Sequence, residues 1–278
     1  MNTLEKTARK NITITVDKNY CIFAAVMLHS FFLNNAANEY YIHIVTNVRN
    51  PFFKIPLYYI LKKHRAKYTF YFIDEKTIQA SGKVVITLHI TIATYFRLFL
   101  PSVLDKIDKT LFLDSDMIID GKLNELYDTN IEQYALGAVS TPNEERTKTL
   151  NLSNAYFNAG VMLLNLSYLR TNNFEPQFIQ FIQAYPEKII FWDQDVLNAT
   201  TGKFMLPIAT KWNGMANLIN AGETATIIHY AGSHKPWSGH SEHPLKDKYF
   251  QYLQTDFVLQ LLEKCYRFYF RTLAKLKK

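Results

Sequence analysis

Cysteine is scarce in this sequence, and no apolar stretch is long enough to cross a membrane. The two cysteines, Cys21 and Cys265, stand far apart among 278 residues. Such a pair offers neither zinc-site spacing nor a disulfide framework, so we expect free thiols in a reducing compartment. The N-terminal residues are charged throughout and contain no apolar segment of the signal-peptide type. These absences favour a cytoplasmic protein.

Acidic residues are fewer than basic ones, 24 against 31, which gives a formal net charge of +7. This excess favours an anionic partner, such as a phosphate, an acidic lipid surface or nucleic acid, without choosing among them. Hydrophobic residues make up 48% of the chain, so a sizeable core is expected and a disordered chain is excluded. No repeat or linker divides the first 240 residues. We expect a catalytic domain over residues 1–245 and an appendage over residues 246–278.

Short β-rich segments alternate with helical ones near the N-terminus. The alternation predicts strands at 11–16, 40–46 and 68–73, and helices at 20–34 and 51–64. This pattern is typical of a parallel sheet covered by helices, and it resembles the βαβαβ half of a nucleotide-binding fold. We therefore predict an α/β fold with a mainly parallel central sheet.

Later segments continue the alternation. We expect further strands at 110–113, 135–140 and 155–166, and helices at 91–104, 174–186 and 193–202. The first of these helices should be helical up to Pro101, and the last should begin with an aspartate cap at Asp193 and stop at Gly202. Gly160 interrupts a strand, which suggests a bulge or a close approach of the backbone to a ligand.

Two aspartates, Asp114 and Asp116, interrupt the apolar segment LFLDSDMII at residues 111–119. Unpaired carboxylates are costly in such surroundings, so we expect a compensating partner. At a strand end both carboxylates can face one bound cation. Mn²⁺ and Mg²⁺ prefer oxygen ligands and often share them with phosphate. The pair favours a metal-diphosphate site, and a solvated turn is the ordinary alternative.

Two other classes of protein remain open at this point. A phosphatase of the haloacid dehalogenase type also carries an apolar Asp-x-Asp pattern, with its nucleophile at a strand end. That pattern usually lies near the N-terminus and has Thr or Val two positions after the second aspartate, whereas this chain has Ile118 there and lacks the later lysine and acidic motif. A non-enzymatic membrane-binding protein would require neither aspartate.

Six motifs occur in one order along the chain. They are ITVDKNY (14–20), HITIATYFRLFLP (89–101), FLDSDMII (112–119), YFNAGVMLLN (156–165), WDQDVLN (192–198) and HYAGSHKPW (229–237). Together they resemble the family 8 retaining glycosyltransferases, in particular the bacterial lipopolysaccharide glucosyl- and galactosyltransferases. The resemblance implies a GT-A type fold and transfer of glucose or galactose from a UDP-sugar to a lipopolysaccharide core or lipooligosaccharide acceptor. Self-glucosylation, as in the glycogenin-like branch of the family, is an alternative.

The resemblance implies ligands for a metal and for the donor diphosphate. Asp114, Asp116 and His229 match the residues that hold Mn²⁺, with Mg²⁺ as the alternative ion. Gly232 and Lys235 match positions at the diphosphate, where glycine permits close backbone approach and lysine offsets charge. Without these neighbours, His229 would be interpreted as a hydrogen-bonded strand residue and Lys235 as a solvated loop residue.

Other matching positions lie on the nucleotide and the sugar. By resemblance Asp17 accepts a hydrogen bond from uracil, Asn19 contacts the nucleoside and Tyr20 stacks on the base. The ordinary alternative for Asp17 is a helix N-cap. The remaining positions implied to contact the donor are Arg97, Ser115, Asn158 and Asp195.

The motif WDQDVLN contains the residues that the resemblance implies are catalytic. Gln194 matches the residue nearest the reacting face of the sugar. Because an amide is a poor nucleophile, we expect a front-face displacement in which the Gln194 carbonyl stabilises oxocarbenium charge. Asp193 is expected to bind sugar hydroxyls, and a metal would help UDP leave. The ordinary alternative is an acidic first turn of a helix.

The acceptor side is less well matched. His89 and Thr94 match acceptor-side positions of the family. Ser140, Thr141 and Pro142 stand where the similar galactosyltransferases tend to carry an aspartate, so the acceptor contacts stay open.

The C-terminal segment 257–278 interleaves six basic residues after Glu263 with four aromatic ones. Such a helix suits an anionic bilayer surface, and an ordinary helix with a solvated basic face is the alternative. We expect peripheral binding to the cytoplasmic face of the inner membrane, where a lipid-linked saccharide acceptor would lie. No nucleic-acid recognition module accompanies the aromatic and basic residues, so we expect no nucleic-acid partner.

Overall fold

The computed structural model describes residues 9–276 with the exception of 75, 77–91, 221 and 240. His89, one of the two predicted acceptor-side residues, lies outside the described residues. The strands are β1 (Lys10–Val16), β2 (Tyr40–Thr46), β3 (Lys67–Phe72), β4 (Lys109–Leu113), β5 (Met117–Ile119), β6 (Leu136–Ser140), β7 (Phe157–Asn165), β8 (Met205–Pro207) and β9 (Ile227–His229).

Helices cover both sides of the sheet. The α-helices are α1 (Cys21–Asn34), α2 (Pro51–Lys63), α4 (Leu100–Val103), α5 (Asn124–Asp128), α6 (Glu144–Thr149), α7 (Leu166–Thr171), α8 (Phe174–Ala184), α9 (Trp192–Thr201), α10 (Asp247–Gln254) and α11 (Phe257–Leu276). The 3₁₀-helices are η1 (Ala37–Glu39), η2 (Ile92–Phe99), η3 (Pro186–Lys188), η4 (Gly202–Phe204), η5 (Thr210–Trp212) and η6 (Pro236–Ser238).

The large sheet has seven strands in the order β3-β2-β1-β4-β7-β6-β8. β1, β2, β3 and β4 are parallel neighbours, β7 is antiparallel to β4 and β6, and β8 is parallel to β6. The mainly parallel sheet and the N-terminal βαβαβ unit are therefore confirmed. Ile12 and its neighbour Thr13, which point to opposite faces of β1, are both fully buried, as expected for a parallel strand that is covered on both faces.

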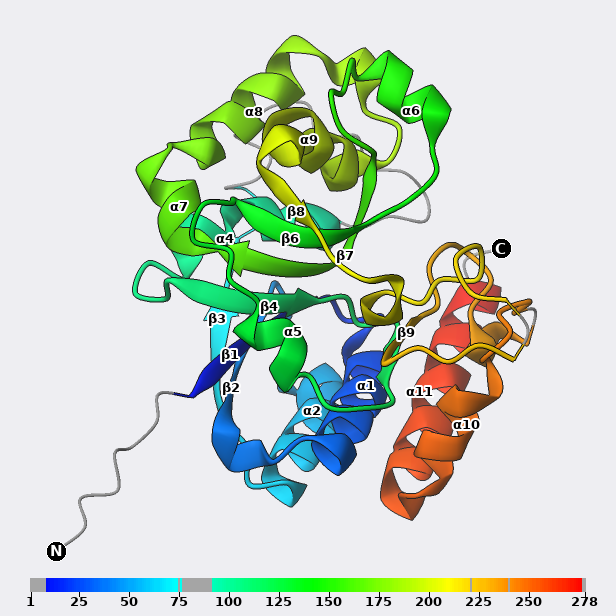
Figure 1. The fold of residues 1–278 in the computed structure, drawn as a ribbon. Coiled ribbons are helices and arrows are strands. Elements are labelled where there is room, and N and C mark those ends of the chain that lie inside the picture. The colour runs from blue at the N-terminus through cyan, green and yellow to red at the C-terminus, as the bar shows by residue number, and fades with distance from the viewer. Residues whose placement is uncertain (1–8, 75, 77–91, 221, 240, 277–278) are drawn as a thin grey trace, which may run out of the picture.

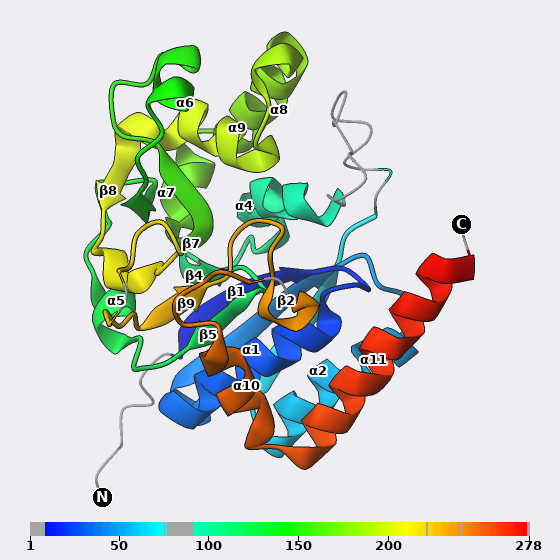
Figure 2. The same ribbon diagram turned by 90° about the vertical axis from the view of Figure 1, so that its right-hand side faces the viewer.

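Two apolar layers enclose the sheet. On one side α1 and α2 pack with β1 and β2, and on the other side α7, α8 and α9 pack over β7 (Figure 1). Helix α1 is apolar around most of its circumference. This is compatible with its position, since α10 and α11 cover the side that faces away from the sheet (Figure 2). A helix buried on all sides has no polar face to present to water.

Two helix boundaries differ from the sequence-based expectation. The segment predicted as a helix up to Pro101 is the 3₁₀-helix η2, followed by the short helix α4 in which Pro101 occupies the first turn. Proline is tolerated there because the first-turn N–H groups have no intrahelical acceptor. Helix α9 starts at Trp192 and no side chain of its preceding residue caps it. Asp193 lies inside the first turn, so its prediction as the cap was wrong.

A second, two-stranded sheet places the Asp-x-Asp segment. β5 pairs antiparallel with β9, so that Met117 lies opposite His229. The backbone N–H of Tyr230 donates to the carbonyl of Asp116, with a nitrogen-to-oxygen distance of 3.0 Å. This pairing joins segments that are more than one hundred residues apart in the sequence, and it brings Asp116 and His229 close together.

The C-terminal helices pack on the same core as the rest of the chain. Leu253 on α10 and Leu259 and Tyr266 on α11 are buried in the apolar cluster that contains α1. The division of the chain near residue 245 stays a prediction. No helix of the described residues has the length and apolar character needed to cross a membrane.

Candidate active site

Three predicted metal ligands meet where β4 ends and β5 pairs with β9. One ligand atom from each of Asp114, Asp116 and His229 can be chosen so that all three lie within 4.8 Å of one another. The imidazole Nε2 lies 3.4 Å from a carboxylate oxygen of Asp116. The donor set combines two carboxylates with an imidazole, which fits a divalent cation such as Mn²⁺.

Asn213 fixes the imidazole of His229 for this purpose. The side-chain oxygen of Asn213 lies 2.8 Å from Nδ1 of the histidine. A carbonyl oxygen can only accept a hydrogen bond, so this contact places a proton on Nδ1 and leaves Nε2 as the ring atom that would bind a metal. Histidines that bind metals are commonly oriented by such a second hydrogen bond.

The two aspartates have cationic partners from the protein itself. The Asp114 carboxylate lies 2.8 Å from Nη2 of Arg97, and Lys235 contacts the Asp116 carboxylate. Burial raises the pKa of Asp114, although Arg97 opposes this shift. Burial acts in the same direction on Asp116, but Lys235 and His229 outweigh it and hold the pKa below its usual range. These partners explain how an apolar segment accommodates two carboxylates.

Arg97 connects the metal ligands to the predicted catalytic segment. Its Nε lies 2.8 Å from the carboxylate of Asp193, and its Nη1 donates to the carbonyl of Ala159 at 2.6 Å. Burial raises the pKa of Asp193 to about 7, and Arg97 moderates the shift. Arg97, Asp114 and Asp193 therefore form one buried charge network.

Gln194 and Asn158, both predicted at the sugar, are hydrogen-bonded to each other. The Gln194 carbonyl accepts from Nδ2 of Asn158 at 2.9 Å and from the backbone N–H of Ala159 at 3.0 Å. The amide nitrogen of Gln194 donates to the hydroxyl of Tyr156 at 3.0 Å. These three contacts fix both ends of the amide.

Asp195 faces inward rather than toward the site. It is fully buried, and its carboxylate lies 2.9 Å from Arg146 and 2.7 Å from the Tyr156 hydroxyl. It also accepts from the backbone N–H groups of Ile190 and Phe191 at 2.7 and 2.6 Å. Asp195 therefore has several partners within the protein, and it satisfies the N–H groups that precede α9. Its contact with the donor stays a prediction.

Arg146 and Tyr156 are functional candidates that the sequence reasoning did not single out. Arg146 lies in the charged segment NEERTK, which resembles a solvated helix, yet only 2% of it is exposed. Tyr156 is the first residue of the motif YFNAG. Its position in the motif could have indicated a role at the site, because a tyrosine hydroxyl can donate and accept hydrogen bonds.

The residues predicted at the nucleotide lie in the turn between β1 and α1. The Asp17 carboxylate accepts from the backbone N–H groups of Asn19 and Tyr20 at 2.8 and 3.0 Å. Burial and the nearby carboxylates of Asp116, Asp17 and Asp114 raise the pKa of Tyr20. The Ser115 hydroxyl donates to the carbonyl of Thr15 at 3.0 Å. These contacts place the turn beside the Asp-x-Asp segment.

The loop after β9 completes this edge of the site. Gly232 has a φ of +84°, a backbone conformation that residues other than glycine rarely adopt. Lys235 donates to the carbonyl of Tyr230 at 2.6 Å as well as contacting Asp116. Thr94, the second predicted acceptor-side residue, lies in η2, where its carbonyl accepts from Nε of Arg97 at 3.3 Å. Its predicted role in acceptor binding stays a prediction.

The parallel βαβ half, the carboxylate pair at the carboxyl edge of β4 and the adjoining imidazole define a nucleotide-sugar-dependent glycosyltransferase of the GT-A fold. The chain belongs to Glycosyl transferase family 8, whose sequence profile matches residues 11–241. Family membership sets aside the phosphatase and the non-enzymatic interpretations.

Curated relatives are similar over much of the chain. General stress protein A of Bacillus subtilis is 28% identical over 188 residues, which cover 59% of this chain and 66% of that protein, slightly under two thirds. Lipopolysaccharide 1,3-galactosyltransferase of Salmonella typhimurium is 26% identical over 261 residues, which cover 87% of this chain and 77% of that protein. Lipopolysaccharide 1,2-glucosyltransferase of Escherichia coli is 24% identical over 249 residues, which cover 82% and 73%.

Solved structures support the fold. The galactosyltransferase LgtC, in complex with donor and acceptor sugar analogs, superposes with a TM-score of 0.79 at 21% identity and covers 89% of this chain and 96% of its own. The glycosyltransferase GlyE of Streptococcus pneumoniae gives a TM-score of 0.70 at 18% identity and covers 93% and 63%. Similarity at these identities establishes the fold.

Proposed function

We propose that this protein is a Mn²⁺-dependent retaining glycosyltransferase that moves glucose or galactose from a UDP-sugar to a lipopolysaccharide core or lipooligosaccharide acceptor. The observation that carries the proposal is the convergence of Asp114, Asp116 and His229 beside the ion pair between Arg97 and Asp193, the residue that precedes Gln194. The relatives named as lipopolysaccharide galactosyl- and glucosyltransferases support the acceptor class and both candidate sugars.

In the proposed donor pose, the diphosphate lies at the metal ligands and the uridine lies at the turn between β1 and α1. A divalent cation held by Asp114, Asp116 and His229 would neutralise the diphosphate and assist its departure. Lys235 would add a second positive charge, and the backbone at Gly232 would approach the phosphate oxygens closely. The turn at Asp17, Asn19 and Tyr20 would receive the uridine, as the resemblance to the family implies.

In the proposed transfer the Gln194 amide lies at the reacting carbon. The bond from that carbon to the diphosphate oxygen breaks, and an acceptor hydroxyl forms the new bond on the same face. The proton of the hydroxyl passes to the departing diphosphate. The contacts of Gln194 with Asn158, Ala159 and Tyr156 hold its dipole in one orientation, which limits reorganisation as positive charge develops. Contact of Asp193 with sugar hydroxyls stays a prediction, because its carboxylate lies against Arg97.

The test is UDP release from a panel of UDP-sugars with Mn²⁺ or with EDTA. We expect UDP-glucose or UDP-galactose to turn over with Mn²⁺ and EDTA to abolish the reaction. Asp114→Asn should lose the activity, whereas Asp108→Asn, which removes a carboxylate paired with Arg170, should keep it. If no donor releases UDP in the presence of metal, the proposal fails. Sugar found on a tyrosine of this chain would instead support self-glucosylation.

We also propose that α11 holds the enzyme at the cytoplasmic face of the inner membrane, where a lipid-linked acceptor lies. Phe257, Leu261 and Phe268 are exposed at spacings of four and seven residues, so they share one face of the helix. The basic residues Lys264 and Arg271 are exposed on the same helix. An apolar face beside cations suits an anionic bilayer surface.

A further inference from the structure

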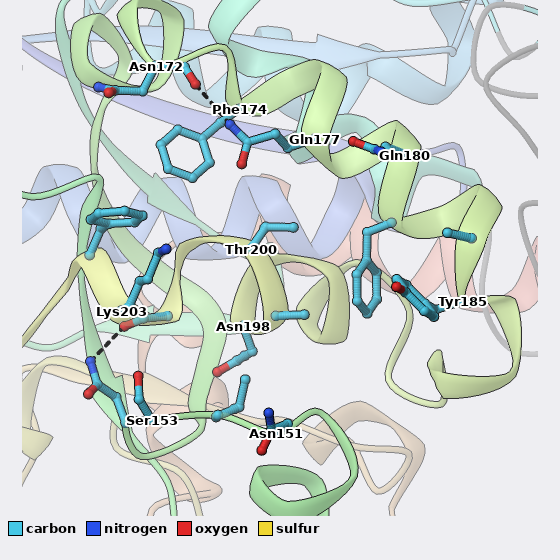
Figure 3. Close-up of a pocket in the computed structure, with 17 residues that line it drawn as sticks. Asn151, Ser153, Asn172, Phe174, Gln177, Gln180, Tyr185, Asn198, Thr200 and Lys203 are labelled. Atoms are coloured by element: carbon cyan, nitrogen blue, oxygen red, sulfur yellow. Dashed lines mark hydrogen bonds between the residues drawn. The ribbon is translucent and has the colours of Figure 1, made fainter.

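A cleft lies near the C-terminal end of α9, between this helix, α8 and residues 151–154 (Figure 3). Its volume is about 510 Å³, which is within the usual size range of small-molecule sites. The lining excludes Gln194 and the three proposed metal ligands. The cleft is therefore separate from the reacting centre proposed above.

The cleft is lined by amides and aromatic rings instead of charges. Its amide side chains and rings include Asn151, Asn154, Asn172, Gln177, Gln180, Phe174, Phe181, Tyr185 and Phe204. Lys203 is the one charged residue among the described residues of the lining. Such a surface has little to attract a nucleotide or a phosphate, and it suits a neutral ligand with many hydroxyl groups and apolar C–H faces.

Two of the amides are held in place by the backbone. The Gln177 amide nitrogen donates to the carbonyls of Asn172 and Asn173 at 2.9 and 3.2 Å, and that of Asn154 donates to the carbonyl of Gly202 at 3.0 Å. Each tether consumes a donor and leaves the side-chain oxygen as an oriented acceptor. In Figure 3 a dashed line joins the Gln177 amide nitrogen to Asn172, and the Gln177 oxygen points away from that contact. Preorganised acceptors of this kind suit ligand hydroxyls.

Gln180 and Tyr185 provide the complementary groups. Within the part of the chain that the structure describes, the Gln180 side chain makes no hydrogen bond, so its donors and its acceptor are available to a ligand. Tyr185 is 44% exposed, and its ring lies 5.3 Å from that of Phe181. Exposed aromatic faces carry partial negative charge and can stack on the C–H face of a sugar ring.

We propose that the cleft between α8 and α9 binds a neutral saccharide, as a second glycan site separate from the reacting centre. Thr200 in this cleft follows Gln194 by six residues, about 9 Å along the helix axis. A sugar here would hold one part of a glycan while another part meets the donor. The residues that line the cleft indicate the class of ligand. Only the identification of this glycan as part of the acceptor rests on the proposed function.

Binding of lactose, cellobiose and maltotriose to the full chain tests this proposal, measured by saturation-transfer NMR without donor or metal. We expect at least one of them to bind in the millimolar range. Tyr185→Ala and Gln177→Ala should each weaken that binding by about fivefold or more, since one stacking or hydrogen-bonding contact is lost. Gln183→Ala, on the same helix but outside the lining, should leave the affinity unchanged.

Two results would overturn the proposal. One is that none of the three saccharides binds, and the other is that Tyr185→Ala and Gln177→Ala bind as tightly as the unmodified protein. Release of UDP from donor with Mn²⁺ is measured in parallel, and we expect all three variants to retain it. Because the binding assay contains neither donor nor metal, a failure of the proposed transferase activity and a failure of this second site give different results.

Discussion

Gly160 and His229 are in direct contact, and the imidazole occupies the space that a side chain at position 160 would need. A β-carbon added to Gly160 would lie 2.3 Å from Cε1 of His229 and 2.9 Å from Nδ1. The sequence predicted a bulge or a ligand approach at this glycine. The structure has a register shift between β6 and β7 near it, but the group in close approach is the proposed metal-binding histidine.

Replacement of this glycine should therefore disable the proposed metal site. We expect Gly160→Ala to displace His229 and to lower Mn²⁺-dependent UDP release by about tenfold or more. A metal ligand that is no longer correctly oriented typically reduces metal affinity or activity by about that factor. The matched control is Gly202→Ala, since a β-carbon there meets no atom within 4 Å. Equal activity in the two variants would contradict the assignment of His229.

Asn213 offers a test that leaves all proposed metal ligands in place. Asn213→Ala removes the acceptor on Nδ1 of His229, so we expect the Mn²⁺ concentration for half-maximal UDP release to rise by about tenfold. Asn11→Ala is the control, because Asn11 also contacts a buried histidine, His43, at 3.0 Å but in the large sheet. A similar Mn²⁺ requirement in both variants would mean that Asn213 does not tune the metal site.

Tyr156 should act as a positioning residue for Gln194. Tyr156→Phe removes the hydroxyl that accepts from the Gln194 amide and donates to Asp195. We expect kcat to fall by about tenfold with little change in the KM for the donor, because an interaction that orients the reacting centre is lost. Tyr71→Phe, which removes a hydroxyl bonded to His43, is the control. An unchanged kcat for Tyr156→Phe would refute the role.

Stability should depend on pH through His29, which joins α1 to α2 and to the turn before α11. Its ring nitrogens lie 3.0 Å from His64 and 2.8 Å from Thr255. Burial, together with His64 and Lys63, lowers the pKa of His29 from 6.5 to about 4. Between these values the folded protein binds fewer protons than the unfolded chain, so stability that is present above pH 6.5 is lost as the pH falls toward 4.

Urea unfolding at pH 7.5 and at pH 5.0 measures this effect. His29→Gln should reduce the loss of unfolding free energy between the two pH values by up to about 2 kcal/mol relative to the unmodified protein. His234→Gln, which replaces an exposed histidine, should not. If the unmodified protein and His29→Gln lose the same stability, His29 is not the group that titrates.

Membrane binding is best tested on the exposed face of α11. Removal of the whole helix would uncover the core, since Leu259 and Tyr266 are buried against the rest of the chain. We expect Leu261→Ser combined with Phe268→Ser to reduce co-sedimentation with anionic phospholipid vesicles while UDP release is retained. Ile190→Ser, at an exposed apolar residue away from α11, is the control. Undiminished vesicle binding by the double variant would count against the proposed surface.

Much of the N-terminal half could be predicted because its signals are local. The runs at 11–16 and 40–46 are rich in β-branched and aromatic residues, and the helix between them is mostly apolar and has no charged residue. These patterns predict strands and a buried helix without knowledge of any long-range contact. The segment 92–103 was less predictable, because a 3₁₀-helix and an α-helix show similar patterns over so few residues.

The sequence by itself determined the order of strands and helices in this half of the protein, and the motifs that identify its family. Only the tertiary structure decided which charges meet. It paired Arg146 with Asp195 and turned both inward, joined Arg97 to Asp114 and Asp193, and formed the cleft between α8 and α9. The physical reason is that periodicity depends on neighbours along the chain, whereas an ion pair or a cleft depends on which distant segments the folded sheet brings together.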